Sequence, residues 1–474
     1  MPLSRVAVPR LPVARLESVI GPERLTELIE AAARFRQRLA GRSVWNINST
    51  AVGGGVAEML QALVGYVEDL DIDIRWLVIS GDAEFFAVTK RLHNRIHGEP
   101  GDGGSLGARE AGHYGEVLAG HASALSDQIQ PGDLVLLHDP QTAGLTAPLV
   151  QLGARVVWRC HIGADAQNHV TASAWEFLGP HLSRADGYVF SRRQHVPPWV
   201  PGPATWIIPP SIDPFSAKNQ DLDWPTVRAI LARIGILDGT PTPASARFTR
   251  RDGSPGEVER QASLVVEELP GPDDRLVVQV SRWDRLKDML GVLRGFAEHV
   301  ALSGPGYLVL AGPSVAGVSD DPEGLAVYEE CLAEWRSLPA GARRRVMLAT
   351  LPLDDVDENA AMVNALQRHA TVIVQKSLAE GFGLTVAEGM WKGRPVVGSA
   401  VGGIQDQIAR DTGILLPDST DLAAFGKAVR ELLDRPDLAE QIGTAARAHV
   451  RDHFIGDIHL LRYAQLFNTL IGYQ

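Results

Sequence analysis

Apolar and polar positions follow one another along the chain in a repeated pattern. Short runs rich in Val, Ile and Leu are each followed by a polar or Gly-containing turn and then by a stretch with helical periodicity. Because these runs are apolar at nearly every position, they predict strands covered on both faces, and the helical stretches between them predict parallel pairing. The predicted strands are 43–48, 74–80, 133–139, 154–161, 187–191 and 205–209 in the first half, and 275–281, 307–312, 345–350, 371–375, 395–399 and 413–417 in the second.

This order of elements predicts an α/β protein built from two doubly wound, Rossmann-like domains. The proline-rich segment 207–216 marks the boundary, so we assign residues 1–212 to an N-terminal domain and 213–456 to a C-terminal domain. Residues 421–454 predict two helices that break at Arg435-Pro436. Residues 457–474 predict a last helix that packs back on the N-terminal domain.

Ligands of open α/β sheets bind at the carboxyl ends of the strands, so two such domains are expected to face each other across a ligand-binding cleft. The segment 238–261 is rich in Pro, Gly, Ser and charge and predicts a long surface loop. We find no chemical role for it. Candidate chemistry is therefore sought in the turns that follow the strands.

Composition and charge exclude several classes of protein. The formal net charge of −12, from 45 basic and 57 acidic residues, argues against a general nucleic-acid or anionic-membrane binder. The two cysteines, Cys160 and Cys331, lie in apolar segments and are expected to be buried thiols rather than a disulfide or metal site. No apolar run has the length of a signal peptide or a membrane span, so we expect a cytoplasmic protein.

A glycine-rich turn follows the first strand of the N-terminal domain. Gly53, Gly54 and Gly55 would let the backbone approach a ligand, and a helix from Val56 would aim its amides at the same point. A strand-to-helix turn without a ligand is the other interpretation. The segment carries neither a G-x-G-x-x-G fingerprint nor a phosphate-binding Gly-Lys-Ser/Thr, so a nicotinamide cofactor is not supported.

Two cations follow the first strand of the C-terminal domain. Arg282 and Lys287 are expected between the end of this strand and the start of a helix. Arginine binds phosphate oxygens in pairs and lysine acts as a point charge, so the two suit a diphosphate. A solvated, salt-bridged turn would explain the same residues.

A pair of carboxylates surrounds a flexible turn later in this domain. Glu380 precedes the turn Gly381-Phe382-Gly383, and Glu388 lies about one helical turn inside a helix that begins near Leu384. At roughly 1.5 Å per helical residue the carboxylates are on the order of 10 Å apart. This spacing fits hydroxyl groups on both sides of a diphosphate, as in a nucleotide sugar. Asp-x-Asp pairs at 69–73 and 355–358 favour turns, and no His/Cys cluster has metal-ligand spacing, so no metal site is predicted.

The motifs at 282–287 and 380–388, in this order, resemble the donor site of retaining family 4 glycosyltransferases of the GT-B fold. A closer resemblance covers most of the chain. The segments "VWNINSTAVGGGVAEML", "FFAVTKRLHNRIHG", "LHDPQTAGL", "WRCHIGAD" and "PPSIDP" are similar to the trehalose glycosyltransferring synthases, which join a nucleoside-diphosphate glucose to free glucose.

The resemblance implies a role for each matched donor-site residue. Arg282 and Lys287 would hold the diphosphate and stabilise its departing charge, and Glu388 would bind the ribose. Glu380, Gly381 and the amides of Phe382, Gly383 and Leu384 would bind the donor glucose, while Gly54 and Gly55 would close over the donor. His161 would lie near the transferred sugar, which makes it a catalytic candidate beside Arg282, Lys287 and Glu380. The implied acceptor-binding residues are Asn48, His138, Asp139, Gln141, His161 and Asp165.

The implied reaction is a reversible, retaining transfer of glucose to glucose that gives trehalose. It requires no cofactor beyond the nucleoside-diphosphate glucose, and Mg²⁺ is compatible with it but not implied by the sequence. The partners would be small molecules and a second copy of the chain, without nucleic acid or membrane. Trehalose phosphorylase, another family 4 transferase and an inactive sugar-binding protein are the alternatives. The nucleotide base and the physiological direction cannot be read from these residues.

Overall fold

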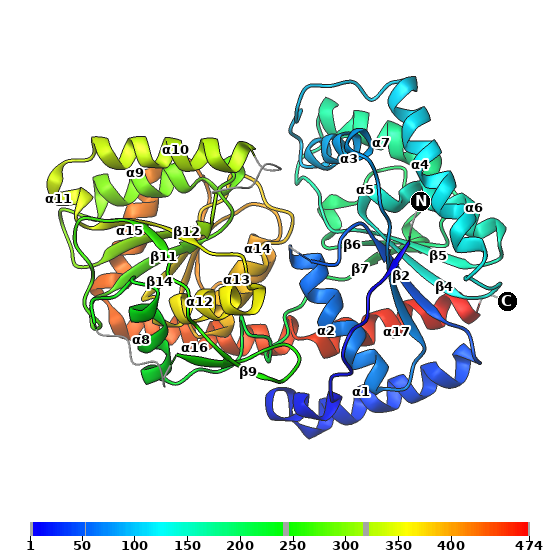
Figure 1. Ribbon diagram of the computed structural model, residues 1–474, viewed down its shortest axis with the longest axis horizontal. Coiled ribbons are helices and arrows are strands. Elements are labelled where there is room, and N and C mark those ends of the chain that lie inside the picture. The colour runs from blue at the N-terminus through cyan, green and yellow to red at the C-terminus, as the bar shows by residue number, and fades with distance from the viewer. Residues whose placement is uncertain (1–2, 53, 240–245, 316–321, 473–474) are drawn as a thin grey trace. The chain divides into compact units, whose positions relative to one another are not determined.

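The computed structural model describes residues 3–52, 54–239, 246–315 and 322–472. These residues divide into two compact units. The first unit contains the chain up to Ser211 and again from Phe454 onward, and the second unit is Ile212–His453. In Figure 1 the first unit is blue to cyan-green with the red terminal helix, and the second is green to orange.

A mostly parallel sheet forms the centre of the first unit, with strand order β1-β3-β2-β4-β5-β6-β7. Only β1 runs antiparallel to its neighbour, β3, among these strands. The strands are β1 (Ser4–Arg5), β2 (Val44–Asn48), β3 (Ile74–Val78), β4 (Leu134–His138), β5 (Arg155–Cys160), β6 (Gly187–Phe190) and β7 (Thr205–Ile207).

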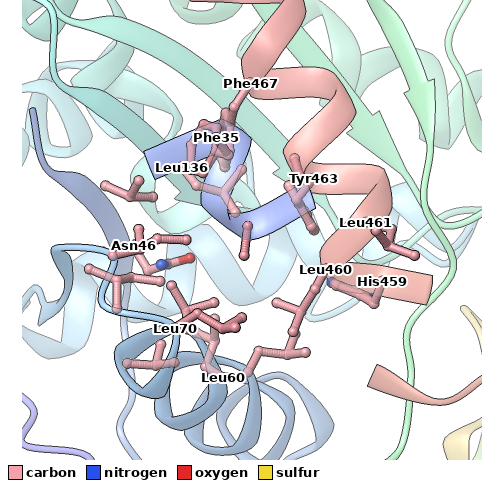
Figure 2. Close-up of a pocket in the computed structure, with 18 of the residues that line it drawn as sticks. Phe35, Asn46, Leu60, Leu70, Leu136, His459, Leu460, Leu461, Tyr463 and Phe467 are labelled. Atoms are coloured by element: carbon pink, nitrogen blue, oxygen red, sulfur yellow. The ribbon is translucent and has the colours of Figure 1, made fainter. Parts of the chain in front are cut away.

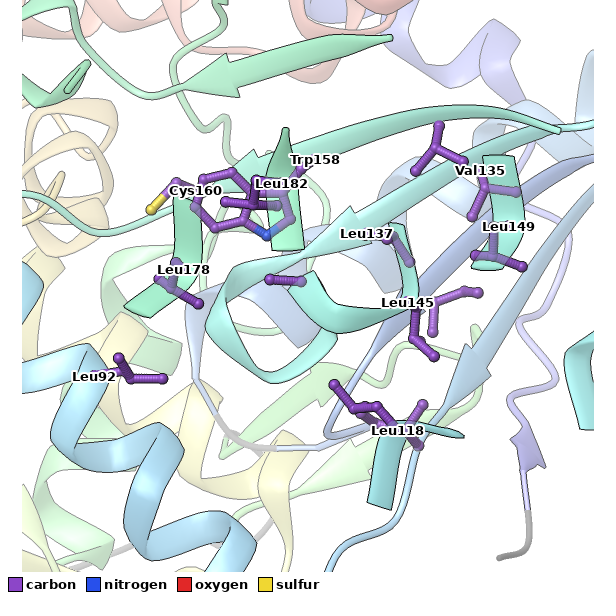
Figure 3. Close-up of a cluster of buried hydrophobic side chains, with 14 of the residues drawn as sticks. Leu92, Leu118, Val135, Leu137, Leu145, Leu149, Trp158, Cys160, Leu178 and Leu182 are labelled. Carbon is purple, nitrogen blue, oxygen red and sulfur yellow. The ribbon is translucent and has the colours of Figure 1, made fainter. Parts of the chain in front are cut away.

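Helices cover both faces of this sheet because successive side chains of each strand point to opposite faces. Trp45 and Ile47 of β2 belong to the core under α3, α4, α6 and α7, part of which Figure 3 shows. Val44 packs on the other face against α1, α2 and α17. The helices are α1 (Glu17–Leu39), α2 (Gly55–Asp69), α3 (Ala83–Ile96), α4 (Ala108–Ser126), α5 (Asp139–Thr142), α6 (Thr146–Gln151), α7 (His169–Leu182) and α17 (Gly456–Gly472).

A mainly apolar cavity of about 80 Å³ lies on the second of these faces, between the sheet and α1, α2 and α17. Figure 2 shows Phe35 of α1, Leu60 of α2 and Tyr463 of α17 around it. Asn46 of β2 and His138 of β4 also line it, so the polar ends of these strands adjoin an apolar space.

The second unit repeats this architecture, with strand order β10-β13-β12-β11-β14-β15-β16 and β10 antiparallel to β13. Its strands are β8 (Arg247–Thr249), β9 (Pro255–Glu257), β10 (Ser263–Val265), β11 (Leu276–Val280), β12 (Tyr307–Pro313), β13 (Val346–Leu351), β14 (Val372–Gln375), β15 (Val396–Ser399) and β16 (Ile414–Leu416). Its helices are α8 (Trp224–Arg233), α9 (Met289–His299), α10 (Pro322–Ser337), α11 (Ala340–Arg343), α12 (Val356–His369), α13 (Leu384–Trp391), α14 (Ile404–Gln407), α15 (Leu422–Asp434) and α16 (Pro436–His453). Leu293 of α9, Cys331 of α10 and Leu432 of α15 pack on one face of this sheet.

The predicted fold class, two doubly wound α/β domains, is confirmed. Each predicted strand overlaps an observed one to within one or two residues at either end, and the helix break between α15 and α16 falls at Arg435. The prediction of a long loop at 238–261 is wrong in part, because β8 and β9 pair there as an antiparallel hairpin. Phe248 is buried in this hairpin, and a Cβ on Gly256 would lie 2.5 Å from its ring, so a single aromatic side chain packs the turn. Residues 240–245 lie outside the described part of the chain.

Within the described residues, no helix is both long enough and apolar enough to cross a membrane. Cys160 and Cys331 are both buried and are not joined in a disulfide.

Candidate active site

The loop that carries Arg282 and Lys287 follows β11 in the second unit. Trp283 anchors it, since this side chain is 1% exposed and its Nε1 donates to the carbonyl of Pro313 at 2.9 Å. The Asp284 carboxylate accepts the backbone N–H of Leu286 at 2.8 Å and starts a short 3-10 helix that ends at Lys287. The Arg282 side chain is 58% exposed and contacts Asp284 at 3.0 Å. The fixed tryptophan therefore holds a loop that presents two cations.

Lys287 and Glu380 form an ion pair, with 2.5 Å between Nζ and Oε2. The two side chains are only 17% and 11% exposed, so much of the charge is removed from water. Ser377 Oγ lies 3.4 Å from the same carboxylate oxygen, and Gln279 Nε2 donates to the Lys287 carbonyl at 2.7 Å. The structure thus brings together two residues that the sequence places in separate motifs.

A second ion pair ties the two loops to each other. Lys376 is fully buried, and its ammonium contacts the Asp288 carboxylate and donates to the carbonyl of Ser419 at 2.7 Å. Asp288 has a φ of 49° and caps the N-terminus of α9. The backbone N–H of Leu378 donates to the carbonyl of Leu286 at 2.8 Å. An ion pair and a backbone hydrogen bond therefore link the Arg282–Lys287 loop to the loop before α13.

The predicted Gly381-Phe382-Gly383 turn leads into α13, which begins at Leu384. Gly383 has a φ of 83°, a conformation that glycine adopts without strain. The turn rests on Gly402, where a Cβ would come within 1.6 Å of the carbonyl oxygen of Glu380. Gln407 Nε2 also donates to the carbonyl of Phe382 at 2.5 Å. Gly402 and Gln407 thus hold the turn in place, and the first backbone amides of α13 follow directly after it.

Glu388 lies in the second turn of α13 and is 6% exposed. Its Oε1 is 3.6 Å from Lys218 Nζ. Lys392, one helical turn further on, donates to the Asn219 side chain at 2.9 Å and to the Glu388 carbonyl at 3.2 Å. Burial lowers the pKa of Lys392 well below its usual value, and the Glu388 charge opposes that shift. The predicted ribose-binding carboxylate therefore lies in a buried, positively charged surrounding.

In the first unit, Gly54 and Gly55 form the N-terminus of α2, and Gly53 lies outside the described residues. Gly54 has a φ of 83°. Asn48, at the end of β2, accepts from Trp76 Nε1 at 2.8 Å and donates to the Thr50 carbonyl at 2.7 Å. Both ends of the Asn48 amide therefore support the glycine-containing loop and the neighbouring strand.

His138 and His161 follow one another at the ends of β4 and β5, and their rings stack with centroids 5.3 Å apart. His138 Nδ1 is 3.0 Å from His161 Nε2, and His138 Nε2 is 3.1 Å from Asn46 Oδ1. Arg159 Nε is 3.5 Å from His161 Nδ1. Burial, together with the Arg159 charge, lowers the pKa of His138 to about 3 and that of His161 well below its usual value. Both imidazoles are therefore neutral near pH 7.

Asp139 and Gln141 belong to α5, directly after β4. The Asp139 carboxylate accepts the backbone N–H of His161 at 2.8 Å, and burial raises the pKa of this carboxyl to about 6. Gln141 is half-buried in the same short helix. Asp139 thus links the two histidines, because it follows His138 in the chain and accepts a hydrogen bond from the backbone of His161. Gln141 lies near them because it is two residues further along the same short helix.

Asp165 belongs to a separate charged cluster of the first unit. Its carboxylate contacts the guanidinium of Arg192, which is 3% exposed, and lies 3.7 Å from His195 Nε2. The side chain of Asp165 itself remains 34% exposed. The charge that the sequence assigned to the acceptor pocket is therefore paired with an arginine that the sequence analysis missed.

Five residues at these positions were missed: Asn46, Arg159, Arg192, Lys218 and Lys376. Two of them carried a signal, because Asn46 and Arg159 are polar residues inside otherwise apolar strands. Within the described part of the chain, no group of three or more His, Cys, Asp or Glu side chains is arranged to hold a metal ion.

Comparisons with known proteins show the family to which the chain is similar. A family model described as "Trehalose synthase, N-terminal domain" matches residues 46–197, and one described as "Glycosyl transferases group 1" matches residues 356–449. The trehalose synthase of Pyrococcus horikoshii is 34% identical over 460 residues, which cover 96% of each chain. The trehalose phosphorylase of Pleurotus pulmonarius is 25% identical over 94% of this chain but only 62% of its own.

Solved structures support the same fold. An Escherichia coli structure titled as trehalose-6-phosphate bound with UDP-2-fluoro glucose has a TM-score of 0.65 and 12% identity, and the match covers 91% of this chain and 99% of that one. At this identity the likeness concerns the fold alone, and this fold is GT-B.

Proposed function

We propose that this chain, which belongs to the trehalose synthase family of glycosyltransferases, transfers glucose from a nucleoside diphosphate to free glucose and so forms trehalose. The transfer retains the configuration of the anomeric carbon and is reversible. The proposal rests on the family for the sugar chemistry and on the second unit for the donor.

One observation carries the choice of donor: two cations and two carboxylates occupy linked loops of one unit. Arg282 and Lys287 suit the diphosphate, because phosphate oxygens bind arginine bidentately and lysine as a point charge. Glu380 lies beside Lys287, and Glu388 lies about one turn inside α13. A carboxylate accepts hydrogen bonds from the vicinal hydroxyls of a sugar. Glu380, the two cations and Glu388 would therefore bind the glucose, the diphosphate and the ribose of the donor, respectively.

The proposed reaction is a substitution on one face of the donor sugar. The bond between the anomeric carbon and the phosphate oxygen breaks, and the anomeric hydroxyl oxygen of the acceptor glucose bonds to that carbon from the same side. The proton of the acceptor passes to the departing phosphate oxygen. Arg282 and Lys287 stabilise the charge that develops on the diphosphate. Stabilisation of developing charge by groups already in place is usually the largest single contribution to catalysis, and the rest comes from positioning the two sugars.

The acceptor is proposed to bind in the first unit near His138, His161 and Asp139. The two histidines offer no positive charge to a phosphate group, because both are neutral near pH 7. Asp165 pairs with Arg192 and leaves the neighbouring cluster without a free positive charge from that arginine. This arrangement favours free glucose over a sugar phosphate as acceptor.

Phosphorolysis of trehalose is the second candidate, because the trehalose phosphorylase of Pleurotus pulmonarius is also similar. The same two cations would bind inorganic phosphate. Glu388 would then have no ribose to bind, although it is buried on the helix that carries the donor turn. The cytoplasmic location remains a prediction from the pattern of apolar residues, and the homodimer remains a prediction from the family resemblance.

The test is a panel of UDP-, ADP-, GDP- and TDP-glucose with free glucose, scored for a non-reducing disaccharide. In the reverse direction, trehalose is supplied with either a nucleoside diphosphate or inorganic phosphate, and glucose release is measured. Release with the nucleotide alone supports the proposal, whereas release with phosphate alone assigns a phosphorylase. A protein that binds these sugars without turnover would be an inactive sugar-binding protein.

The matched variants are Arg282→Ala and Arg285→Ala. The two arginines lie on the same loop and are equally exposed, at 58%, but Arg285 pairs with Glu330. Loss of transfer in the first variant with retention in the second is the expected result. Equal activity of the two variants would remove Arg282 from the donor site.

A further inference from the structure

A chain of hydrogen bonds runs across three neighbouring strands of the first unit. It starts at Arg159 in β5, passes through His161 and His138, and ends at Asn46 in β2, over distances of 3.5, 3.0 and 3.1 Å. These four residues are 0%, 8%, 2% and 4% exposed, respectively. The parallel register places His138 beside Arg159 and Leu136 beside Asn46, which sets the spacing of the chain.

The chain has one direction because its first member can only donate. A guanidinium carries protons on all its nitrogens, so Arg159 Nε–H requires a lone pair on His161 Nδ1. His161 then carries its proton on Nε2 and donates to His138 Nδ1. His138 in turn carries its proton on Nε2 and donates to the carbonyl oxygen of Asn46. One fixed charge therefore selects one tautomer in each of two histidines.

The groups around the chain reinforce this arrangement. Arg159 Nη1 donates to the Tyr463 hydroxyl of α17 at 3.3 Å, and Arg159 Nη2 is buried without a hydrogen-bond partner among the described residues. His459 of α17 is buried near Arg159 and Arg462, and this surrounding lowers its pKa. Asp139 of α5 is the carboxyl close enough to interact with the Arg159 charge. The cation is thus incompletely neutralised and opposes a second charge on His161.

We propose that Arg159 is a positioning residue that holds His161 and His138 as neutral, single tautomers and thereby prevents either histidine from acting as the acid or base of the transfer. This inference rests on the proposed glucosyl transfer. All ring nitrogens of both histidines are engaged within the protein, so the acceptor proton has no histidine lone pair to enter. This agrees with the proposed reaction, in which the proton passes to the departing phosphate oxygen.

The inference predicts how the reaction responds to pH. With Arg159 in place, neither histidine titrates between pH 8 and pH 5.5. In Arg159→Met the donor and the charge are lost, so His161 can bind a proton. A charged His161 would oppose the positive charge that develops on the transferred sugar, so the rate is expected to fall about tenfold per pH unit below the new pKa. The Asp139 carboxyl has a pKa of about 6 in the wild type, and loss of the Arg159 charge is expected to raise that pKa further. The readout is therefore the difference between the variant and the wild type.

The decisive measurement uses the enzyme without substrate. Two-bond ¹H–¹⁵N correlation spectra of protein labelled in its histidines report the tautomer and charge of each ring, and the His138→Gln and His161→Gln variants assign the two signals. Wild-type protein is expected to show both rings protonated on Nε2 and unchanged from pH 8 to pH 5.5. A His161 ring protonated on Nδ1, or one that titrates in this range, would overturn the inference.

Two further variants separate positioning from folding. Tyr463→Phe removes a different contact of the same guanidinium and is expected to leave both tautomers and the pH profile unchanged. Arg159→Lys keeps a buried cation and a donor and is expected to restore the wild-type profile that Arg159→Met loses. If Arg159→Met does not fold, an Arg159→Lys protein with the wild-type spectrum sustains the inference, and one with a titrating His161 refutes it. Because the spectra need no substrate, a wrong donor or acceptor would appear only in the transfer assay.

Discussion

The ion pair between Lys287 and Glu380 offers the sharpest test of the donor site. Its two side chains are mostly buried, at 17% and 11% exposure, and their charged atoms are 2.5 Å apart. The change is Lys287→Met, which removes the charge and keeps the apolar stem. Two effects are expected: loss of stabilisation of the departing diphosphate, and a carboxylate left without its partner beside an anionic substrate.

The size of the first effect follows from similar preorganised charges in other enzymes. Removing one such group costs about 10²–10³ in rate, or roughly 3–4 kcal/mol. The unpaired Glu380 adds repulsion, so Lys287→Met is expected to lose about 10³-fold in kcat/KM for the donor, and Glu380→Gln about 10²-fold. Because Glu380→Gln removes the stranded charge, the double variant is expected to lose about 10³-fold rather than 10⁵-fold, a coupling of roughly 2.7 kcal/mol.

The assay is the initial rate of trehalose formation with the preferred nucleoside-diphosphate glucose, measured for the wild type, both single variants and the double variant. Thermal melting accompanies it, because breaking a partly buried pair also costs about 2 kcal/mol, or roughly 4–8 °C in Tm for a unit of this size. Arg285→Met is the control for a cation on the same loop. Fold losses that simply multiply in the double variant would refute the reasoning.

Three other predictions follow from described contacts. The pKa of His138 is about 3 in the folded protein and about 6.5 in the unfolded chain. The free energy of unfolding is therefore highest above pH 6.5 and falls as the pH falls, by about 2 kcal/mol at pH 5. Urea unfolding of wild type and His138→Gln at pH 7.5 and pH 5 should show this difference, and parallel curves would contradict it. Asp165→Asn frees the Arg192 charge and should raise the preference for glucose 6-phosphate over glucose by roughly tenfold in kcat/KM; an unchanged ratio would place this pair away from the acceptor. Lys376→Met leaves the Asp288 carboxylate unpaired and should lower the free energy of unfolding by about 3 kcal/mol and raise the donor KM; a melting curve and KM like those of the wild type would show that the pair does not hold the loops together.

The sequence predicted the central strands well because their pattern has a single physical cause. A parallel strand covered on both faces must be apolar throughout, and each such run became a strand. The edge strands β1 and β10 escaped prediction because they are only two and three residues long and have no apolar run. The hairpin of β8 and β9 escaped for the same reason, because each of its strands has three residues and Phe248 is the one large buried side chain in them.

The donor motifs were readable because their residues are close along the chain. Glu380 and Glu388 belong to one loop and one helix, and the distance between them follows from helix geometry. The pairing of Lys287 with Glu380 spans 93 positions and could be anticipated only from the resemblance. Lys218 and Lys376 had no such support, since a lysine in a polar segment is ordinarily a solvated surface residue.

The histidine chain shows why the other half of the chemistry was harder to predict. His161 and His138 were predicted one at a time, as residues at strand ends, and their tautomers depend on a third residue, Arg159, inside a buried strand. Arg159 was visible as a charge in an apolar run, but its effect on the histidines required the parallel register that sets β4 beside β5. A charged residue in such a strand is costly unless it is hydrogen-bonded, so its presence indicates that the buried cation serves the groups beside it. In a doubly wound sheet, a polar residue at an inward position near a strand's carboxyl end is therefore a better guide to the site than a histidine considered alone.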